Sequence, residues 1–436
     1  MTLSQLYTTF DKGTPPSSLG TDRDYNIDLI PKLMLASEEL VDILIFTDVV
    51  RYLEFKQIAG SYVYRKGKID KAIVLNSWPR NRLLALVVST VLLIVAVILS
   101  GGLSGAPLIP ATPNEALMSS LFGFMEKIRA RSFFEFIAKY DPADPSTHDN
   151  LDFKKMTASD VFKYFKLTPD VQEIIGHSMC LFQDDSFLQL PFSEIYNAMV
   201  LYSTSLRRAS TSPYIYPRYG LGELPQSFAR LSAVFGGTYM LAMPDIKIVR
   251  GEDGKVIGVS SKDEMAKCSA VICDPSYAAS GGIETKVTNR VIRAICILNN
   301  PVPNTDNADS LQLIIPMSQV GRKHDIYVAV TSYAHDVAAK GHYIAIVSTV
   351  VETNDPEREI QIALNLLGPI VEKFVKIYDV CVPLDDGRSS NIFVSKSYDA
   401  TSHFISVTQD VNDIYQRLTG DKLKLEKRAT MDEEAK

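Results

Sequence analysis

Cysteine is scarce in this sequence, and the cysteines that occur are not paired. Five are spread over 436 residues without a Cys-x-x-Cys spacing: Cys180, Cys268, Cys273, Cys296 and Cys381. An odd number of widely spaced cysteines argues against a disulfide framework and against a zinc site, and it fits a reducing compartment. The six histidines also lack the His-Glu-x-x-His spacing of a helical metal site, so we expect no metal ion.

Clustered basic charge and recognisable catalytic motifs are missing as well. The chain carries a net charge of −6 with its lysines and arginines dispersed, whereas a nucleic-acid-binding domain gathers them on one face. There is no Gly-x-Ser-x-Gly, no cysteine–histidine signature and no convincing pair of carboxylates. We therefore expect no catalytic residue and no nucleic-acid partner. The opening MTLSQLYTTFDKG lacks the basic-then-apolar pattern of a signal peptide, and no Asn-x-Ser/Thr sequon occurs.

One uncharged run contrasts with this otherwise soluble composition. Residues Leu83–Ser100, LLALVVSTVLLIVAVILS, come close to the length that spans a bilayer. Arg80 and Arg82 precede the run, and the next basic residue is Lys127. The positive-inside rule would then place the residues after Ser100 outside the cytosol.

The most informative stretch is Ser212–Leu241, SPYIYPRYGLGELPQSFARLSAVFGGTYML. Its tyrosines and prolines predict an ordered extended loop, because proline fixes φ and aromatic rings anchor a loop to a surface. A helix is expected to begin at Glu223 and to run to about Phe235, before Gly236-Gly237. Four apolar side chains at helical spacing should face the core: Leu224, Phe228, Leu231 and Phe235.

The predicted helix also has a polar face. Glu223, Gln226 and Arg230 lie on consecutive turns, and Thr238 follows on the same side of the motif. Such a face is either a solvated helix surface or a binding surface, and the spacing alone leaves both open. A phosphate-binding loop is disfavoured in GLGELP, because proline replaces the third glycine and a carboxylate lies where phosphate would approach.

The motif resembles the signature region of the Rab GDP-dissociation inhibitors, the family that also includes the Rab escort proteins. Further segments resemble that family in the same order along the chain: Asp24–Lys56, Gly60–Lys71, Ala270–Tyr277, His324–Thr353 and Ser397–Phe404. The resemblance implies an α/β (α+β multidomain) protein with the FAD/NAD(P)-binding-like GDI fold. Since the family opens with a buried strand and a glycine-rich turn, we expect an incomplete N-terminal Rossmann unit here.

The resemblance also implies a division into domains. Residues 1–112 would form the first part of domain I, and 113–210 would form an all-helical domain II that binds the prenyl lipid. Residues 211–421 would complete domain I with the Rab-binding motif and the sheets. Residues 422–436 are charge-dense and lack aromatic side chains, so we expect a disordered tail.

The hydrophobic run falls where the family pattern is interrupted. That pattern breaks at Ala72 and resumes at Pro110, so residues 73–109 form an atypical insert, which carries the only tryptophan, Trp78. We interpret it as translated intron sequence in an inactive splice or gene-model variant. A membrane anchor and a soluble packed helix are the alternatives.

By resemblance, Glu223, Gln226, Arg230 and Thr238 match the acid, amide, arginine and threonine with which the family contacts GDP-bound Rab. Arg208 and Tyr214 match the arginine and tyrosine of the mobile loop used in membrane recruitment. The implied protein binds GDP-bound prenylated Rab GTPases, slows GDP release and carries them between membranes and cytosol in vesicular transport.

The same resemblance implies several general properties. We expect a monomer without a cofactor that shields the geranylgeranyl lipid of Rab, resides in the cytoplasm and touches membranes transiently. A Rab escort protein that presents Rab to geranylgeranyltransferase is the nearest alternative. A flavin-dependent oxidoreductase, whose fold the family shares, is the distant one.

Periodicity and turn residues predict the remaining elements. Helices are expected at Asn114–Tyr140, Ala158–Phe165, Asp170–Phe182, Phe192–Arg208, Glu357–Ile377 and Asp410–Leu418. A hairpin is expected over Asp245–Val259, followed by a buried strand that ends at Asp274-Pro275. Further strands are expected in RVIRAICILNNPV, LQLIIPMSQV, DIYVAVTSYA and YIAIVSTVVET.

Overall fold

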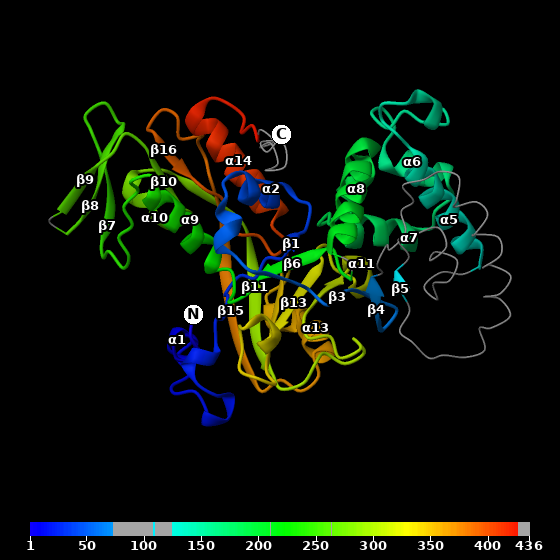
Figure 1. Ribbon diagram of the computed structural model, residues 1–436, viewed down its shortest axis with the longest axis horizontal. Helices are drawn as coiled ribbons and strands as arrows, with labels where there is room; N and C mark the ends of the chain where they lie inside the picture. Colours follow the sequence, from blue (N-terminus) through cyan, green and yellow to red (C-terminus); the bar gives the residue numbers. More distant parts are fainter. Residues whose placement is uncertain (73–107, 110–123, 210, 263, 426–436) are drawn as a thin grey trace, which may run out of the picture. The chain divides into compact units, whose positions relative to one another are not determined.

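A computed structural model describes residues 1–72, 108–109, 124–209, 211–262 and 264–425. The chain forms two compact units, and each is assembled from separate stretches of sequence (Figure 1). The first unit comprises Met1–Lys56, Ile215–Pro301 and Ile326–Lys436, and the second comprises Gln57–Tyr214 and Val302–Asp325. The predicted domain bounds remain a prediction, because the predicted boundary at 112/113 lies outside the described residues.

Four antiparallel strands form the centre of the first unit. They lie in the order β15 (Glu372–Pro383), β11 (Thr285–Leu298), β14 (Tyr343–Val350) and β13 (Ile326–Ser332). Every residue of β13 and β14 is buried, so both faces of these strands are covered and hydrophobicity does not alternate along them. On one face, Leu3, Leu6 and Tyr7 of helix α1 (Leu3–Thr9) pack against apolar side chains of β11, β14 and β15.

The predicted helix at Glu357–Ile377 is wrong in its second half. Helix α12 (Pro356–Glu359) and helix α13 (Gln361–Leu366) are short, and the chain then enters β15. Gly368, at φ +76°, and Pro369 interrupt the helical pattern, since glycine takes this conformation readily and proline cannot donate the next hydrogen bond. The segment beyond pairs with β11 instead.

The predicted hairpin is confirmed as β7 (Ile246–Arg250) and β8 (Val256–Ser261), with β9 (Glu264–Lys267) added to its edge. The strand expected before Asp274 is confirmed as β10 (Val271–Cys273), which pairs in parallel with β16 (Ile392–Val394). Its expected burial is wrong, because 57% of Ile272 is exposed. Two strands alone leave one face of β10 open to solvent.

Other elements of the first unit surround the candidate site. They are β1 (Met34–Leu35), helix α2 (Glu39–Phe46), the 3₁₀ helix η3 (Val49–Tyr52), helix α9 (Glu223–Val234) and helix α14 (Ile405–Thr419). Helix α14 confirms the predicted helix at Asp410–Leu418 and begins earlier. Strand β6 (Tyr214–Pro217) lies between β1 and β2 (Phe55–Gln57) in a small sheet of three short strands.

The second unit contains a small sheet and a helical part. The strands run in the order β12 (Leu311–Ile315), β3 (Gly60–Arg65), β4 (Lys68–Ala72) and β5 (Leu108–Ile109). The helices are α5 (Phe124–Lys139), α6 (Ala158–Tyr164), α7 (Pro169–Glu173) and α8 (Phe192–Ala209) (Figure 1). Edge-to-face contacts join Phe133 to Phe162 and Phe192, which gives the helical part an aromatic core.

The helices of the second unit agree with the sequence in position. Helices α6 and α8 confirm their predictions, and α6 begins at a capping box formed by Thr157 and Asp160. Helix α5 confirms the prediction from Phe124 onward. The predicted helix at Asp170–Phe182 differs in kind, because five residues of α7 lead into a π-helical turn at Ile174–Met179. There the ring of Phe187 packs so tightly on Gly176 that a Cβ would lie 2.1 Å from it.

Several predictions fall on residues that the structure does not describe. They concern the run Leu83–Ser100, most of the insert 73–109 and residues 426–436 of the predicted tail. Among the described residues, no helix combines the length and apolar character needed to cross a bilayer.

Candidate functional site

Helix α9 carries the predicted polar face, and its bounds follow from local sequence. It begins at Glu223, with Pro225 in the first turn, and ends at Val234. Phe235 caps the helix, and Gly236 follows in the left-handed region at φ +86°. Gly237 approaches the helix so closely that a Cβ would lie 2.2 Å from Ser232 Oγ. The predicted extent of the helix is confirmed.

The apolar face of α9 is buried at one end only. Leu224 is 9% exposed and packs with Met34, Leu44 and Val49, while Phe228 and Leu231 are partly buried against the same cluster. The expectation that Phe235 faces the core is wrong, because its side chain is 84% exposed. The cluster lies under the first turns of α9, and Phe235 extends past it at the C-terminal end.

The polar face of α9 is exposed except at its first residue. Gln226 and Arg230 are exposed, and Glu223 is half-buried at the start of the helix. The Arg230 guanidinium lies 4.6 Å from the ring centroid of Tyr52, a cation–π contact that restrains the arginine without hiding it. Thr238 lies in the exposed segment after Gly237. Sequence reasoning missed Tyr52, because only the fold brings η3 beside α9.

The two residues predicted for the mobile loop lie in the second unit. Arg208 is exposed in the last turn of α8. Tyr214 is fully buried at the start of β6, where its carbonyl oxygen accepts the N–H of Ile58 at 3.0 Å. Their role in membrane recruitment stays a prediction.

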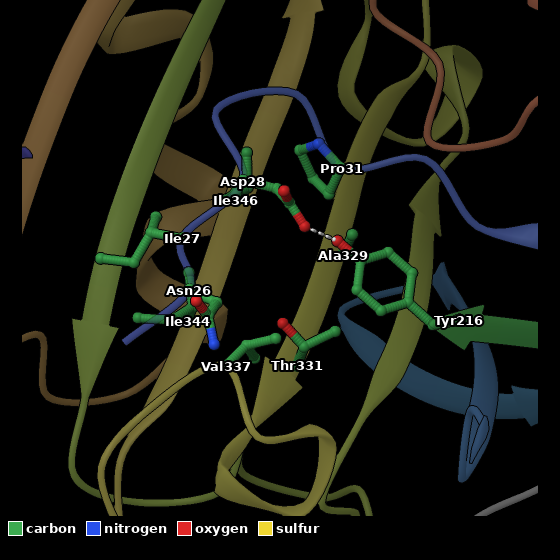
Figure 2. A pocket seen from close by; sticks show the side chains of 10 residues that line it. All are labelled: Asn26, Ile27, Asp28, Pro31, Tyr216, Ala329, Thr331, Val337, Ile344 and Ile346. Carbon is green, nitrogen blue, oxygen red and sulfur yellow. Dashed lines mark hydrogen bonds between the residues drawn. The ribbon is translucent and has the colours of Figure 1, made fainter. Parts of the chain in front are cut away.

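The turn that leads into α9 is fastened to the segment around Asp28 (Figure 2). Asp28 Oδ2 accepts hydrogen bonds from the Tyr216 hydroxyl and from the N–H of Leu221, the latter at 2.8 Å. Burial raises the pKa of Asp28, although both hydrogen bonds oppose that rise. The adjacent cavity has a volume of about 10 Å³, which holds one water molecule at most.

This arrangement bears on the predicted lack of a phosphate-binding loop. The N–H of Leu221, which precedes the helix, already donates to the carboxylate of Asp28. Glu223 adds a second carboxylate in the first turn of α9. The Leu221 N–H is therefore occupied, and the Glu223 carboxylate lies where a phosphate would approach the helix. The geometry agrees with the sequence argument.

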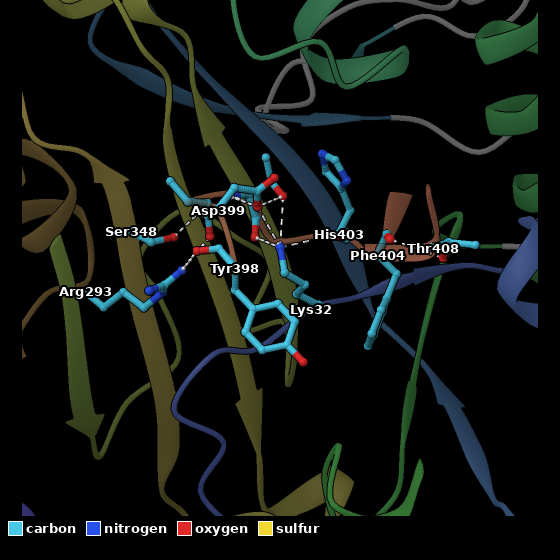
Figure 3. A network of polar contacts seen from close by, with 10 residues as sticks. Lys32, Arg293, Ser348, Tyr398, Asp399, His403, Phe404 and Thr408 are labelled. Atoms are coloured by element: carbon cyan, nitrogen blue, oxygen red, sulfur yellow. Dashed lines mark hydrogen bonds and ion pairs between the residues drawn. The ribbon is translucent and has the colours of Figure 1, made fainter. Parts of the chain in front are cut away.

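Lys32 is a buried lysine that holds the loop at residues 399–403 by hydrogen bonds (Figure 3). Lys32 Nζ donates to Asp399 Oδ1 at 2.8 Å, to the Thr401 carbonyl at 2.9 Å and to the Thr401 hydroxyl at 3.1 Å. Burial lowers the pKa of Lys32, and the charge of Asp399 opposes that effect. Burial would raise the pKa of Asp399, but the charge and hydrogen bond of Lys32, with the Thr401 hydroxyl and the charge of His403, together lower it. Phe404, just beyond this loop, packs against the cluster under α9.

The model of a family described as GDP dissociation inhibitor matches residues 1–87 and 105–430.

The chain belongs to the GDP dissociation inhibitor family.

Curated relatives cover nearly the whole chain. The probable secretory pathway GDP dissociation inhibitor 1 of Schizosaccharomyces pombe is 46% identical over 435 residues, which are 100% of this chain and 90% of that protein. The Rab GDP dissociation inhibitor beta of Rattus norvegicus is 47% identical over 425 residues, which are 97% and 86% of the two chains. The family resemblance noted from the motifs is confirmed.

A solved structure shows that the GDI fold extends over the chain. The crystal structure of the Rab GDI from Plasmodium falciparum superposes with a TM-score of 0.85 at 40% identity, covering 97% of this chain and 90% of that one. The predicted fold class is confirmed. The family match omits residues 88–104, which overlap most of the hydrophobic run Leu83–Ser100. The interpretation of that run as an insert stays a prediction.

Proposed function

We propose that this GDI family member binds GDP-bound, prenylated Rab GTPases through the polar face of α9. Glu223, Gln226, Arg230 and Thr238 form the proposed contact set. The observation that carries the proposal is the exposure of Gln226 and Arg230 on a helix whose opposite face is anchored by Leu224. Relatives named as Rab GDP dissociation inhibitors, at 46–47% identity, support Rab as the partner.

The action on Rab is stoichiometric. A protein that binds the GDP conformer more tightly than the nucleotide-free one stabilises bound GDP by the same coupling free energy, and GDP release slows. Restraint of Arg230 over the Tyr52 ring is worth about 0.5–1 kcal/mol at an exposed position. It also reduces the side-chain entropy that Arg230 loses when it binds a partner.

The helical part of the second unit is the proposed shield for the geranylgeranyl lipid of Rab. Burial of hydrocarbon is worth about 0.8 kcal/mol per CH₂ group, so a shielded isoprenoid offsets the cost of leaving a membrane. The protein would thus act as a cytoplasmic, monomeric carrier that contacts membranes transiently and recycles Rab in vesicular transport. Arg208 and Tyr214 are proposed to act in membrane recruitment.

Replacement of Arg230 tests the proposed contact face. We expect Arg230→Ala to weaken the affinity for a geranylgeranylated, GDP-loaded Rab by roughly 10- to 100-fold, as truncation of an interface arginine often does. Its free energy of unfolding should change by no more than about 1 kcal/mol, because the side chain is exposed and loses only its contact with the Tyr52 ring. The measurement is a titration of labelled Rab with each variant.

Arg358→Ala is the matched control, since Arg358 is an exposed arginine on helix α12 of the same unit. It should bind like the wild type. Equal affinities for Arg230→Ala and the wild type would rule out α9 as the contact face.

A further inference from the structure

The turn between β6 and α9 is fixed in place by a residue from a distant part of the sequence. The hydroxyl of Tyr216 donates to Asp28 Oδ2 (Figure 2). The N–H of Leu221 donates to the same oxygen. These donors lie 188 and 193 residues after Asp28 in the chain. One carboxylate oxygen therefore joins both ends of the turn to the segment at 26–31.

Backbone geometry shows how closely the two segments meet. Gly220 has φ +89°, and a Cβ built on it would lie 2.9 Å from Asp28 Oδ2 and 3.3 Å from the Asn26 carbonyl oxygen. Glycine allows both the left-handed backbone and this close approach. The contact is a direct one between Asp28 and the main chain that leads into α9.

Other side chains and backbone groups also hold the turn. Arg218 bonds to Asp336 at 2.9 and 2.6 Å and to Glu54 at 3.1 Å, but its side chain is 41% exposed. Solvent screens such pairs, so they hold a backbone loosely. The N–H of Tyr219 adds one bond to the His335 carbonyl. The N–H of Arg218 donates to the Glu54 carbonyl at 2.9 Å. Asp28 differs from these anchors in that one side-chain oxygen accepts from both Tyr216 and Leu221.

We propose that Asp28 is a positioning residue for Rab recognition: by accepting both hydrogen bonds it fixes the turn at 216–221 and presents Glu223 and the polar face of α9 in their binding orientation. The inference rests on the proposed function. Glu223 lies two residues beyond Leu221, so a loosened turn displaces it directly. A partner would then have to order the turn on binding, and affinity would fall.

Two substitutions of Asp28 separate hydrogen-bond acceptance from charge. Asp28→Asn can place its side-chain carbonyl oxygen where Oδ2 lies and accept from both donors. Asp28→Leu keeps the branched shape of the side chain and accepts from neither. We expect the backbone N–H groups within residues 217–226, which exclude Pro217 and Pro225, to exchange hydrogen roughly tenfold faster in free Asp28→Leu protein than in the wild type. The same variant should bind geranylgeranylated, GDP-loaded Rab roughly tenfold more weakly. Asp28→Asn should restore both values to within about twofold of the wild type.

Matched tyrosine variants control for the loss of a buried hydroxyl. Tyr216→Phe removes one of the two donors and should raise exchange at 217–226 to an intermediate rate. Tyr25→Phe removes a similar buried bond, from the Tyr25 hydroxyl to the Leu19 carbonyl at 2.6 Å, and should leave that exchange and the Rab affinity unchanged. If Asp28→Leu does not fold, Tyr216→Phe against Tyr25→Phe decides the same question.

The outcomes distinguish this inference from the proposed function. Unchanged exchange at 217–226 in Asp28→Leu, or equal impairment of Asp28→Asn and Asp28→Leu, overturns the role of Asp28 as an acceptor. Faster exchange with unchanged Rab affinity overturns its role in recognition. A wild-type protein that does not bind Rab refutes the proposed function and the recognition role with it, while the exchange rates still show whether Asp28 fixes the turn.

Discussion

His177 in the second unit is a buried ionisable side chain that contacts two carboxylates instead of solvent. Its Nδ1 lies 2.7 Å from Asp325 Oδ2, and both side chains have no exposed surface. Its Nε2 lies 3.2 Å from Asp185 Oδ1. Burial alone would lower the pKa of His177, but the two carboxylates outweigh burial and raise the pKa to about 9.

This pair predicts how stability depends on pH. A histidine whose pKa is higher in the folded than in the unfolded state contributes its full stability below about pH 6.5, and the contribution disappears as the pH rises through 9. The rise in pKa corresponds to about 3 kcal/mol. Asp325→Asn keeps the shape and the bond from the N–H of Met317 but removes the charge. We expect the wild type to lose more stability to urea than this variant between pH 6.5 and 9.5, because the variant keeps only the contact with Asp185.

The measurement is the free energy of unfolding across that range, with the titration of the His177 ring followed by NMR. A wild-type curve that is flat between these pH values would contradict the charged pair.

Single residues also mark the limit of sequence reasoning. The signature helix showed Glu223, Gln226 and Arg230 on one face because their spacing is local. Nothing local marks Asp28 or Lys32, since their partners lie far along the chain. Lys32, for example, meets Asp399 367 residues later. Long-range polar pairs of this kind depend on the fold, and neither hydrophobic periodicity nor turn residues predict them.

At the scale of elements, the local sequence pattern predicted the structure correctly where the residues favour only one type of element. The helix stop at Gly236-Gly237 and the hairpin around the Gly-Glu-Asp-Gly turn were predictable, because turn residues fix them directly. The second half of Glu357–Ile377 was not, because a mixed polar and apolar run fits a helix and a strand alike. Its pairing with β11 decided the outcome, in register from Glu372 opposite Ile297 onward.

Helix α9 offers an element-scale prediction. Leu224→Ala should destabilise the first unit by about 2–4 kcal/mol, because it opens a cavity beside Met34, Leu44 and Val49. Phe235→Ala should cost less than about 0.5 kcal/mol, since the ring is exposed. Urea unfolding of both variants provides the comparison. Equal losses would mean that Phe235 is buried like Leu224 and that the helix is covered along its whole length.

At the scale of the whole molecule, the proposed tasks are divided between two units. The first holds α9 and the two polar anchors beneath it, at Asp28 and Lys32. The second holds the helical part proposed to shield the lipid. Affinity for prenylated Rab should therefore depend on both units, whereas affinity for unprenylated Rab should depend on the first alone.

The rate of GDP release from a prenylated Rab tests the central claim most directly. Rab loaded with a fluorescent GDP analogue is mixed with excess unlabelled nucleotide and increasing amounts of this protein, and the fluorescence decay is followed. We predict that release slows by roughly tenfold or more and that the effect saturates near one protein per Rab. Arg230→Ala should require a higher concentration for the same effect. Release that remains as fast at saturating protein as in its absence would contradict the assignment as a GDP dissociation inhibitor of Rab.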